Sequence, residues 1–556
     1  MIVNSFYRGI VVDAEIGHPI IGVELKVFND KNELLMLVTS DRLGRWHLKA
    51  DSDISYVEFR AEKFCFLQLN VFKLEKTRNN HIRLLSYSPV GYLGRLEASP
   101  GEKLELRVHS PAEWSYTLHR NGYQREVILQ NGPFAQIIQC LPLGSLVSSG
   151  LDWSISTTIS LPCDLVTGLY SITLNDCNGS CFTMPIVIGP REDGVISDNF
   201  LVIANTNTWQ AYNVWGGKSR YRNFFQDPIN GSIVPFSVKR FGWDRIRLAL
   251  IRRFLRLWRL IPGGPPVSGV RLEPKWTNER LTINRPFPNR WLNADSVSLS
   301  YVDHLAANEW RGLAWLEREG YNYDYCSDRM LHMGEVDITK YKGVVLLGHA
   351  EYWTKEMYHN LYDAIVVHGI PLINLSGNAI YQEVKLDFDG SVTPSRGDFK
   401  ETYTDPAKTI KTYTALDING FAPYQTVPSA IGHWAFEGVT FETAEMDFGK
   451  QCLIDTTLTM NERVYDPLAP GVLRGDMIGS GASGWEIDKV KCPDDKNIQW
   501  LAKGVNHGGG AHMFVIETNQ QFIFSASSIA YVSSLLIDPI CSIITRNVLL
   551  RALKRT

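Results

Sequence analysis

A histidine and a glutamate lie two residues apart in GHAEYW, where His349 and Glu351 directly follow the apolar run VVLLG. In extended backbone, residues i and i+2 point to the same side, so both side chains can face one small site. An imidazole beside a carboxylate suits metal ligation or general acid–base catalysis. The alternative is a surface turn held by a hydrogen bond between the two side chains. Because an expected buried strand and two aromatic residues flank the pair, we favour the functional interpretation.

The next apolar run, IPLINLSGN, ends with Ser376 and Asn378. Asn378 could direct its amide at a substrate carbonyl, as the donors of an oxyanion site do. The alternative, to which we give equal weight, is that Asn378 occupies a left-handed turn position. Ser376 lacks the G-x-S-x-G spacing of a strained nucleophile elbow, so we do not expect covalent catalysis there.

An aromatic segment follows another apolar run nearer the N-terminus. The run NFLVIAN leads into NTNTWQAYNVWGGKSRY, residues 205–221, which contains tryptophans, tyrosines and a Gly-Gly pair. Loops that a rigid scaffold fixes at strand ends often carry binding and catalytic groups. The alternative is a glycine-rich turn that buries its aromatic residues for packing alone, and this segment by itself favours neither.

Two polar segments lie near the C-terminus. GASGWEID contains Glu486 and Asp488, which we expect to hydrogen-bond within their own turn. GVNHGGGAH contains His507 and His512, whose spacing does not suit a pair of metal ligands on a helix. We expect a glycine-rich loop there, followed by a strand pair.

A mostly parallel-sheet α/β domain is expected to position these segments, because strands and helices alternate over residues 195–556. Residues 308–320 and 354–369 have helical spacing, and Thr354 and Gly369 mark the start and the end of the second helix. In an open parallel sheet the functional crevice lies at the carboxyl ends of the strands, so the polar loops should meet there. We expect this domain to resemble the glutamine-amidotransferase-like fold, without the cysteine that such a site uses.

The residues before this domain are expected to form two β-sandwiches. Short alternating strands separated by turn residues predict a transthyretin-like sandwich over residues 1–85, with a structural or interfacial role. Residues 86–194 have the strand rhythm of an immunoglobulin-like sandwich.

The composition is that of a soluble globular protein. The 556 residues are 44% hydrophobic and 21% charged, and the net charge of -3 gives no reason to expect a nucleic acid as partner. The nine cysteines lack metal-ligand spacing, and we expect them to be reduced. We identify no signal peptide and no apolar run as long as a membrane span, so we expect a cytoplasmic protein.

A basic helical insertion is expected at residues 240–262. Its arginines occupy one narrow arc of a helical wheel, and apolar residues occupy another face. Such a helix could lie on an anionic membrane surface. Docking on the protein itself or on a second subunit is the commoner role, so we favour a homo-oligomer over membrane contact.

Five motifs, taken in their order along the chain, resemble the large (beta) subunit of N,N-dimethylformamidase and its relatives. They are TNTWQAYNVWGGKSRY, WLEREGYNYDYCSD, GHAEYW, LSGNAIY and GASGWEID. The resemblance extends from about residue 90 to residue 550. The combination is specific to that family, although no single motif is.

The resemblance implies an amidohydrolase that cleaves the C–N bond of a small linear amide with metal-activated water. In that family a mononuclear iron ion is held by two tyrosinate oxygens and one glutamate, and a small partner subunit is present. The motifs place the glutamate at Glu351, the histidine at His349, the asparagine at Asn378 and one tyrosine ligand at Tyr212. Phenolate and carboxylate are hard ligands suited to Fe(III), a strong Lewis acid. His349 would then shuttle protons and Asn378 would orient the carbonyl group.

The second tyrosine ligand is missing where the resemblance places it. An R-P-aromatic motif should supply it, but NRPFPNR contains Phe287, whose side chain cannot bind a metal. Tyr221, our first choice, or one of Tyr321, Tyr323 and Tyr325 would have to substitute. The alternative is a non-catalytic binding or assembly protein that retains the pocket without the metal.

Overall fold

The computed structural model describes most of the chain, namely residues 5–15, 17, 19–50, 54–75, 79–191, 200–217, 219–220, 279–287, 305–398, 413–415, 421–452, 481–490, 496–506 and 509–555. The basic helix predicted at 240–262 lies outside the described residues, as does Tyr221. The chain divides into two compact units. The first comprises Met1–Tyr87, Val214–Thr277 and Met460–Gly471, and the second comprises Ser88–Asn213, Asn278–Thr459 and Val472–Thr556.

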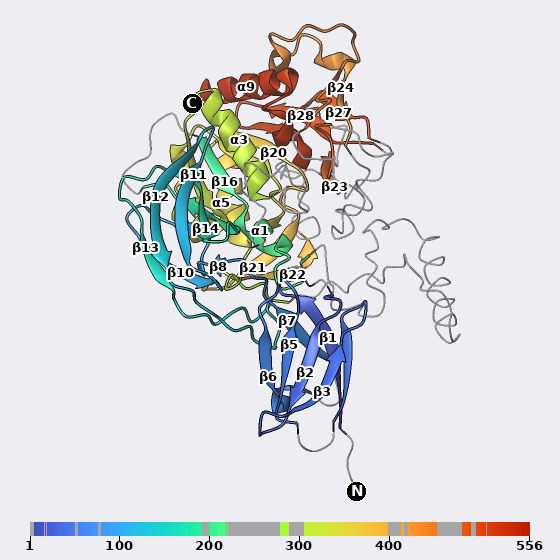
Figure 1. The fold of residues 1–556 in the computed structure, drawn as a ribbon. Coiled ribbons are helices and arrows are strands. Elements are labelled where there is room, and N and C mark those ends of the chain that lie inside the picture. Colours follow the sequence, from blue (N-terminus) through green and yellow to red (C-terminus); the bar gives the residue numbers. More distant parts are fainter. Residues whose placement is uncertain are drawn as a thin grey trace, which may run out of the picture. The chain divides into compact units, whose positions relative to one another are not determined.

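The first unit contains a sandwich of two sheets with the strand orders β4-β1-β7 and β3-β2-β5-β6 (Figure 1). Alternate side chains of both sheets, with Trp46 against Phe59 among them, form one buried cluster. The strands are β1 Ser5–Asp13, β2 Glu24–Phe28, β3 Leu34–Thr39, β4 Arg45–Ala50, β5 Tyr56–Arg60, β6 Leu67–Asn70 and β7 Asn79–Leu84, with the 3-10 helix η1 Val71–Lys73 between β6 and β7.

The second unit begins with two further sheets, ordered β13-β10-β8 and β12-β11-β14-β15-β9. Its strands β14 and β15 are buried along most of their length, and apolar side chains predominate in β15. The strands are β8 Val90–Tyr92, β9 Glu97–Ala98, β10 Lys103–His109, β11 Trp114–Asn121, β12 Arg125–Phe134, β13 Thr157–Ser160, β14 Gly168–Asp176 and β15 Cys181–Ile188.

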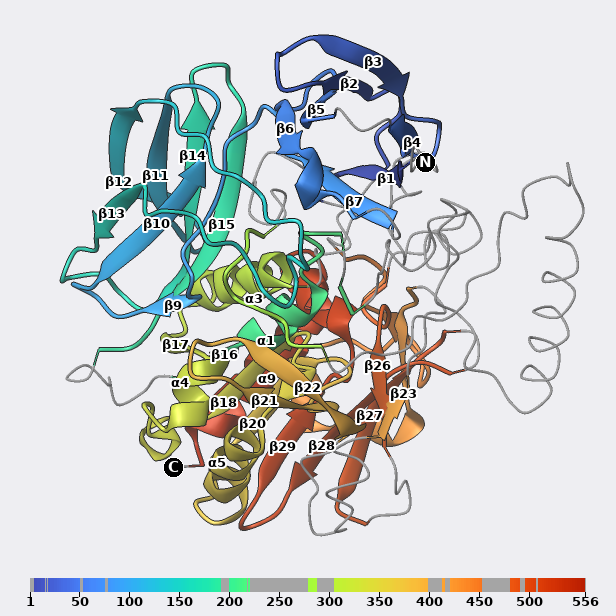
Figure 2. The ribbon, with the colours of Figure 1, turned by 90° about the horizontal axis from the view of Figure 1, so that it is seen from below.

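A nine-stranded sheet, ordered β17-β16-β18-β20-β29-β28-β27-β24-β25, follows in the same unit (Figure 2). The pairings from β17 to β29 are parallel, and those from β29 to β25 are antiparallel. The strands are β16 Phe200–Ala204, β17 Tyr323–Ser327, β18 Val344–Gly348, β20 Leu372–Ser376, β24 Tyr424–Thr426, β25 Asp447–Phe448, β27 Ile498–Gly504, β28 His512–Glu517 and β29 Phe522–Ser525.

The predicted glutamine-amidotransferase-like fold is not supported. The described structure is mostly β-sheet, with several sheets and few helices, and its largest sheet is only half parallel. The physical reason is the pair of short connections around β28, which reverse the chain and impose antiparallel pairing. In the described residues around β28, strands follow one another without the alternating helices on which the prediction rested.

Helices cover both faces of the parallel half. Residues of α5 share one core cluster with Ile203 and Leu346. The neighbouring Leu347 points to the opposite face, where a Cβ on Gly312 of α3 would lie 2.8 Å from its side chain, so that glycine permits the close approach. The α-helices are α1 Thr206–Tyr212, α3 Ala306–Arg318, α4 Asp328–Met333, α5 Lys355–Val366 and α9 Pro539–Leu553.

The predicted N-cap of the second helix is confirmed, because the Thr354 side chain accepts a hydrogen bond from the Met357 amide at the start of α5. The helix ends at Val366, three residues before Gly369, which takes a left-handed conformation. None of the described helices is long and apolar enough to cross a membrane.

The described part of the second unit also contains several short elements. A small sheet is ordered β19-β21-β22, and β23 pairs with β26. These elements are β19 Tyr352–Trp353, β21 Gln382–Leu386, β22 Val392–Asp398, β23 Tyr413–Ala415, β26 Ile487–Lys489, η3 Ile338–Lys340, η4 Pro428–Ala430, η5 Trp434–Phe436 and η7 Ile529–Ser534.

Candidate active site

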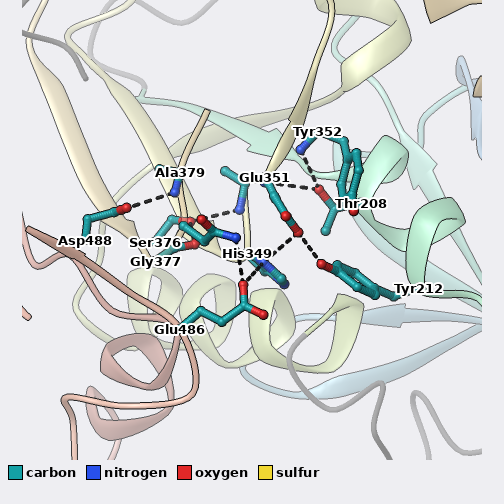
Figure 3. Close-up of polar contacts among 12 residues, drawn as sticks. Thr208, Tyr212, His349, Glu351, Tyr352, Ser376, Gly377, Ala379, Glu486 and Asp488 are labelled. Atoms are coloured by element: carbon teal, nitrogen blue, oxygen red, sulfur yellow. Dashed lines mark hydrogen bonds and ion pairs between the residues drawn. The ribbon is translucent and has the colours of Figure 1, made fainter. Parts of the chain in front are cut away.

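Four chain segments meet at the carboxyl edge of the parallel strands (Figure 3). Tyr212 ends α1, which follows β16, while His349 and Glu351 follow β18. Asn378 lies just after β20, and Glu486 immediately precedes β26. The structure therefore brings Tyr212, His349, Glu351 and Asn378 together, and it adds Glu486 to them.

His349 is the centre of this cluster. Its Nε2 atom lies 3.1 Å from Glu351 Oε2 and 3.0 Å from Glu486 Oε2. The Tyr212 hydroxyl donates a hydrogen bond to Glu351 Oε2, and the Asn378 side-chain amide donates one to Glu486 Oε2 at 2.8 Å. The Tyr212 ring also stacks on the imidazole, with 5.2 Å between ring centroids. All five side chains are buried.

Charges inside the cluster set the protonation of His349. Burial alone would lower its pKa, but the charges of Glu486 and Glu351 and their hydrogen bonds to the ring raise the pKa to about 9. Burial raises the pKa of Glu351, and so does the charge of Glu486, while hydrogen bonds from His349 and Tyr212 oppose these effects. The two carboxyl groups therefore favour the protonated form of His349, and the three side chains together can donate and accept protons.

Hydrogen bonds from neighbouring segments hold the backbone on which His349 and Glu351 lie. Thr208 of α1 accepts hydrogen bonds from the amides of Glu351 and Tyr352, both at 3.2 Å. Ser376 accepts one from the Ala350 amide at 2.8 Å. Ser376 therefore joins the ends of two strands.

The R-P-aromatic motif contacts the helix that carries Tyr212. The fully buried Arg285 donates hydrogen bonds to the carbonyl groups of Gln210 and Asn213, each at 3.1 Å, on either side of Tyr212. Burial lowers the pKa of Arg285 to about 9. Asn213 in turn donates a hydrogen bond to the carbonyl of Pro286, so the motif fixes the end of α1.

Left-handed backbone is concentrated around the cluster. Asn378 has φ 51°, Ile380 φ 50° and Trp485 φ 65°, and none of them is glycine. Such conformations cost on the order of 1–3 kcal/mol each and are common at functional sites. Asn378 therefore occupies the left-handed turn position that was one of its two interpretations, and its amide is directed at Glu486. Its role in orienting a substrate carbonyl stays a prediction.

Glu486 was missed by the sequence analysis. We expected it to bond within its own turn, but it contacts His349 and Asn378 instead. Asp488 likewise accepts a hydrogen bond from the Ala379 amide at 3.1 Å, outside its turn. The position of GASGWEID among the five family motifs was the only signal that could have pointed to this role.

Three of the four tyrosines considered as substitute ligands lie in the described part of the chain, and each of them hydrogen-bonds outside the cluster. Tyr321 donates a hydrogen bond to the Arg546 carbonyl, Tyr323 to Glu317 and Tyr325 to Glu309. Phe287 is buried. His512 lies in β28, where its Nδ1 atom accepts a hydrogen bond from the Val490 amide, and His507 lies outside the described residues.

Gly377 allows the β20 and β26 segments to approach each other. A Cβ atom there would lie 2.2 Å from the Glu486 carbonyl oxygen. We therefore expect Gly377→Ala to push Glu486 away from His349 and to lower the free energy of unfolding by about 1–3 kcal/mol, as overpacking does. Denaturant unfolding measures the loss, and Gly144→Ala is the control because a Cβ at Gly144 has no neighbour within 4 Å. Equal stability of the two variants would show that the close approach does not matter.

Comparison with known proteins identifies the family. Residues 116–542 match the family described as N,N-dimethylformamidase beta subunit-like, C-terminal. Because this span is more than half of the chain, the protein belongs to that family, and the resemblance predicted from the sequence is confirmed. A search of curated proteins found no match.

Solved structures resemble the chain only weakly. Native E. coli alpha-2-macroglobulin is 14% identical with a TM-score of 0.12, and the match covers 36% of this chain and 13% of that one. A DUF3823 family protein from Bacteroides ovatus is 11% identical with a TM-score of 0.14, over 33% of this chain and 99% of that one. TM-scores this low carry no argument about function.

Proposed function

We propose that this protein hydrolyses the C–N bond of a small amide. The observation that carries the proposal is the buried cluster in which His349 lies between Glu351 and Glu486, with Tyr212 bonded to Glu351. Membership of a family named for an enzyme that acts on a formamide supports this substrate class. An imidazolium, two carboxyl groups and a phenol are sufficient to move the protons that amide hydrolysis requires.

The donor groups of the cluster fit a single metal ion. Ligand atoms of His349, Glu351 and Glu486 all lie within 4.8 Å of one another, and the Tyr212 hydroxyl contacts the same Glu351 oxygen as His349. These oxygen donors are hard ligands, which Fe(III) prefers. We propose that Tyr212 and Glu351 hold a mononuclear iron and that Glu486 is available as a further ligand. When bound, the ion would polarise the amide carbonyl and acidify water. Tyr221 stays a predicted ligand.

The chain's own groups divide the proton transfers between them. Glu486 is held by the Asn378 amide and can accept a proton from the attacking water. The water oxygen then bonds to the carbonyl carbon while the C–N bond breaks. Protonated His349 gives its proton to the departing nitrogen. The second polar atom of Asn378, its Oδ1, is buried and has no hydrogen-bond partner among the described residues, so it is available to a substrate N–H group.

A second candidate is a binding or assembly protein that lacks the metal. Phe287 favours it, because the motif that should supply a second tyrosinate reaches the end of α1 through Arg285 and Pro286 yet ends in a side chain that cannot bind metal. The two candidates differ in their metal content.

Metal analysis and an amine-release assay, both on full-length protein never exposed to chelator, separate the two candidates. We expect near-stoichiometric iron and release of amine from small formamides. Metal-free protein that still binds small amides without cleaving them would support the binding protein instead.

We also propose that the chain works in an assembly. Its family is named for the beta subunit of an enzyme, which agrees with a small partner subunit or a homo-oligomer. The cytoplasmic location stays a prediction.

A further inference from the structure

Another buried carboxyl group lies outside the candidate active site, in α3. Glu309, in the first turn of α3, is 1% exposed. Its Oε1 atom accepts hydrogen bonds from the Asn205 side-chain amide at 2.9 Å and from the Trp209 indole at 2.8 Å. Its Oε2 atom accepts one from the Tyr325 hydroxyl. One side chain thus joins α3 to the end of β16, to α1 and to β17.

Two of these donors lead directly to site residues. Trp209 lies one helical turn before Tyr212 in α1, so the Glu309 contact fixes the helix that presents the phenol. Asn205 donates a second hydrogen bond, at 2.7 Å, to the carbonyl of Leu347, which lies two residues before His349. Glu309 is therefore connected to the helix of Tyr212 through Trp209, and to the segment of His349 through Asn205.

The carboxylate form suits these contacts better than the acid form. In every described hydrogen bond to Glu309 the carboxyl oxygen is the acceptor. A protonated Glu309 would carry one O–H donor, and only the Tyr325 hydroxyl among these partners could turn to accept from it. Burial raises the pKa of Glu309 to about 7, against the hydrogen bonds from Tyr325, Trp209 and Asn205. The chain thus keeps a costly buried acid at a place where packing alone would favour an apolar residue.

We propose that Glu309 is a positioning residue for the candidate active site: its carboxylate sets the place of Tyr212 through Trp209 and the place of His349 through Asn205. The catalytic part of this inference rests on the proposed function, whereas the positioning part concerns only the fold. Glu309 itself touches none of Tyr212, His349 and Glu351 through a described hydrogen bond.

The test compares Glu309→Gln with Glu317→Gln. Glu317 lies two turns further along the same helix and also accepts several hydrogen bonds, from Tyr323, Arg120 and the Tyr123 amide, but these do not lead to α1. Glutamine keeps the size of each side chain and removes the charge. Hydrogen exchange of the amides in α1 and in residues 348–352 reports positioning without any need for activity, and steady-state kinetics reports its effect on turnover.

We expect Glu309→Gln to speed exchange in both segments by about tenfold or more, the effect of losing one buried hydrogen bond to a charged group. Glu317→Gln should leave these segments unchanged. For amide hydrolysis, kcat should fall with little change in KM, because the reacting groups rather than substrate contacts are displaced. Equal exchange in the two variants would overturn the proposal. Faster exchange in a protein that cleaves no amide would retain Glu309 as a positioning residue and reject the proposed function alone.

Discussion

Glu351→Gln is expected to lower amide hydrolysis roughly 100-fold or more, the range in which a single acid–base group contributes, and to remove most of the bound iron. Glu351 is in contact with both Tyr212 and His349, so the phenol, the imidazole ring and the proposed metal ion would all depend on its charge. Glutamine keeps the shape of the side chain and can still accept a hydrogen bond from Tyr212. The expected loss of activity and iron therefore comes from removal of the charge rather than from poorer packing. Measurements of kcat and of metal content test this expectation.

Glu383→Gln is the matched control for this change. Glu383 lies in β21, its side chain is 12% exposed, and it contacts Ser395 and Lys355 rather than the cluster. We expect it to keep both activity and metal. A Glu351→Gln protein with full metal content would show that Glu351 is not a ligand, and one that cannot be purified folded would point to a structural role.

Glu486→Gln is expected to abolish most of the activity and to lower the pKa of His349 from about 9 towards its ordinary value of 6.5. The folded-state pKa lies above the ordinary one, so protonated His349 stabilises the fold fully below pH 6.5, and this contribution is lost as the pH rises through about 9. Without the Glu486 charge, the loss of stability should begin at a lower pH. Denaturant unfolding of metal-free protein from about pH 6 to about pH 10 measures the shift.

Asp447→Asn provides the control for Glu486, because it removes one charge in β25, at the edge of the nine-stranded sheet that is far from β18 and His349. Its stability curve should keep the shape of the wild-type curve. If Glu486→Gln gave that same curve, the pairing of Glu486 with His349 would not control the titration.

Local sequence patterns predicted part of the candidate site. The apolar runs before His349 and Asn378 are buried parallel strands, and their register places Gly348 beside Ser376, so the residues that follow lie close together. The proximity of His349 and Asn378 was predictable from parallel pairing, because parallel strands have their carboxyl ends at the same edge of a sheet. The helix after Thr354 was predictable from its capping residue.

The rest depends on contacts that local patterns do not encode. Glu486 comes from a segment more than 100 residues beyond Asn378, and it reaches His349 because Gly377 leaves room for its backbone. The hydrogen bonds of Glu309 span a similar distance along the chain. The mixed sheet was not predicted because a short apolar strand has the same sequence pattern whether it pairs with parallel or antiparallel neighbours.

Release of amine from N,N-dimethylformamide and other small formamides by iron-replete protein tests the central claim most directly. We predict that the wild type and Glu383→Gln release amine and acid in equal amounts, and that Glu351→Gln releases neither above background. No release by iron-replete wild type, or release that Glu351→Gln leaves unchanged, would contradict the claim that this buried cluster hydrolyses amides.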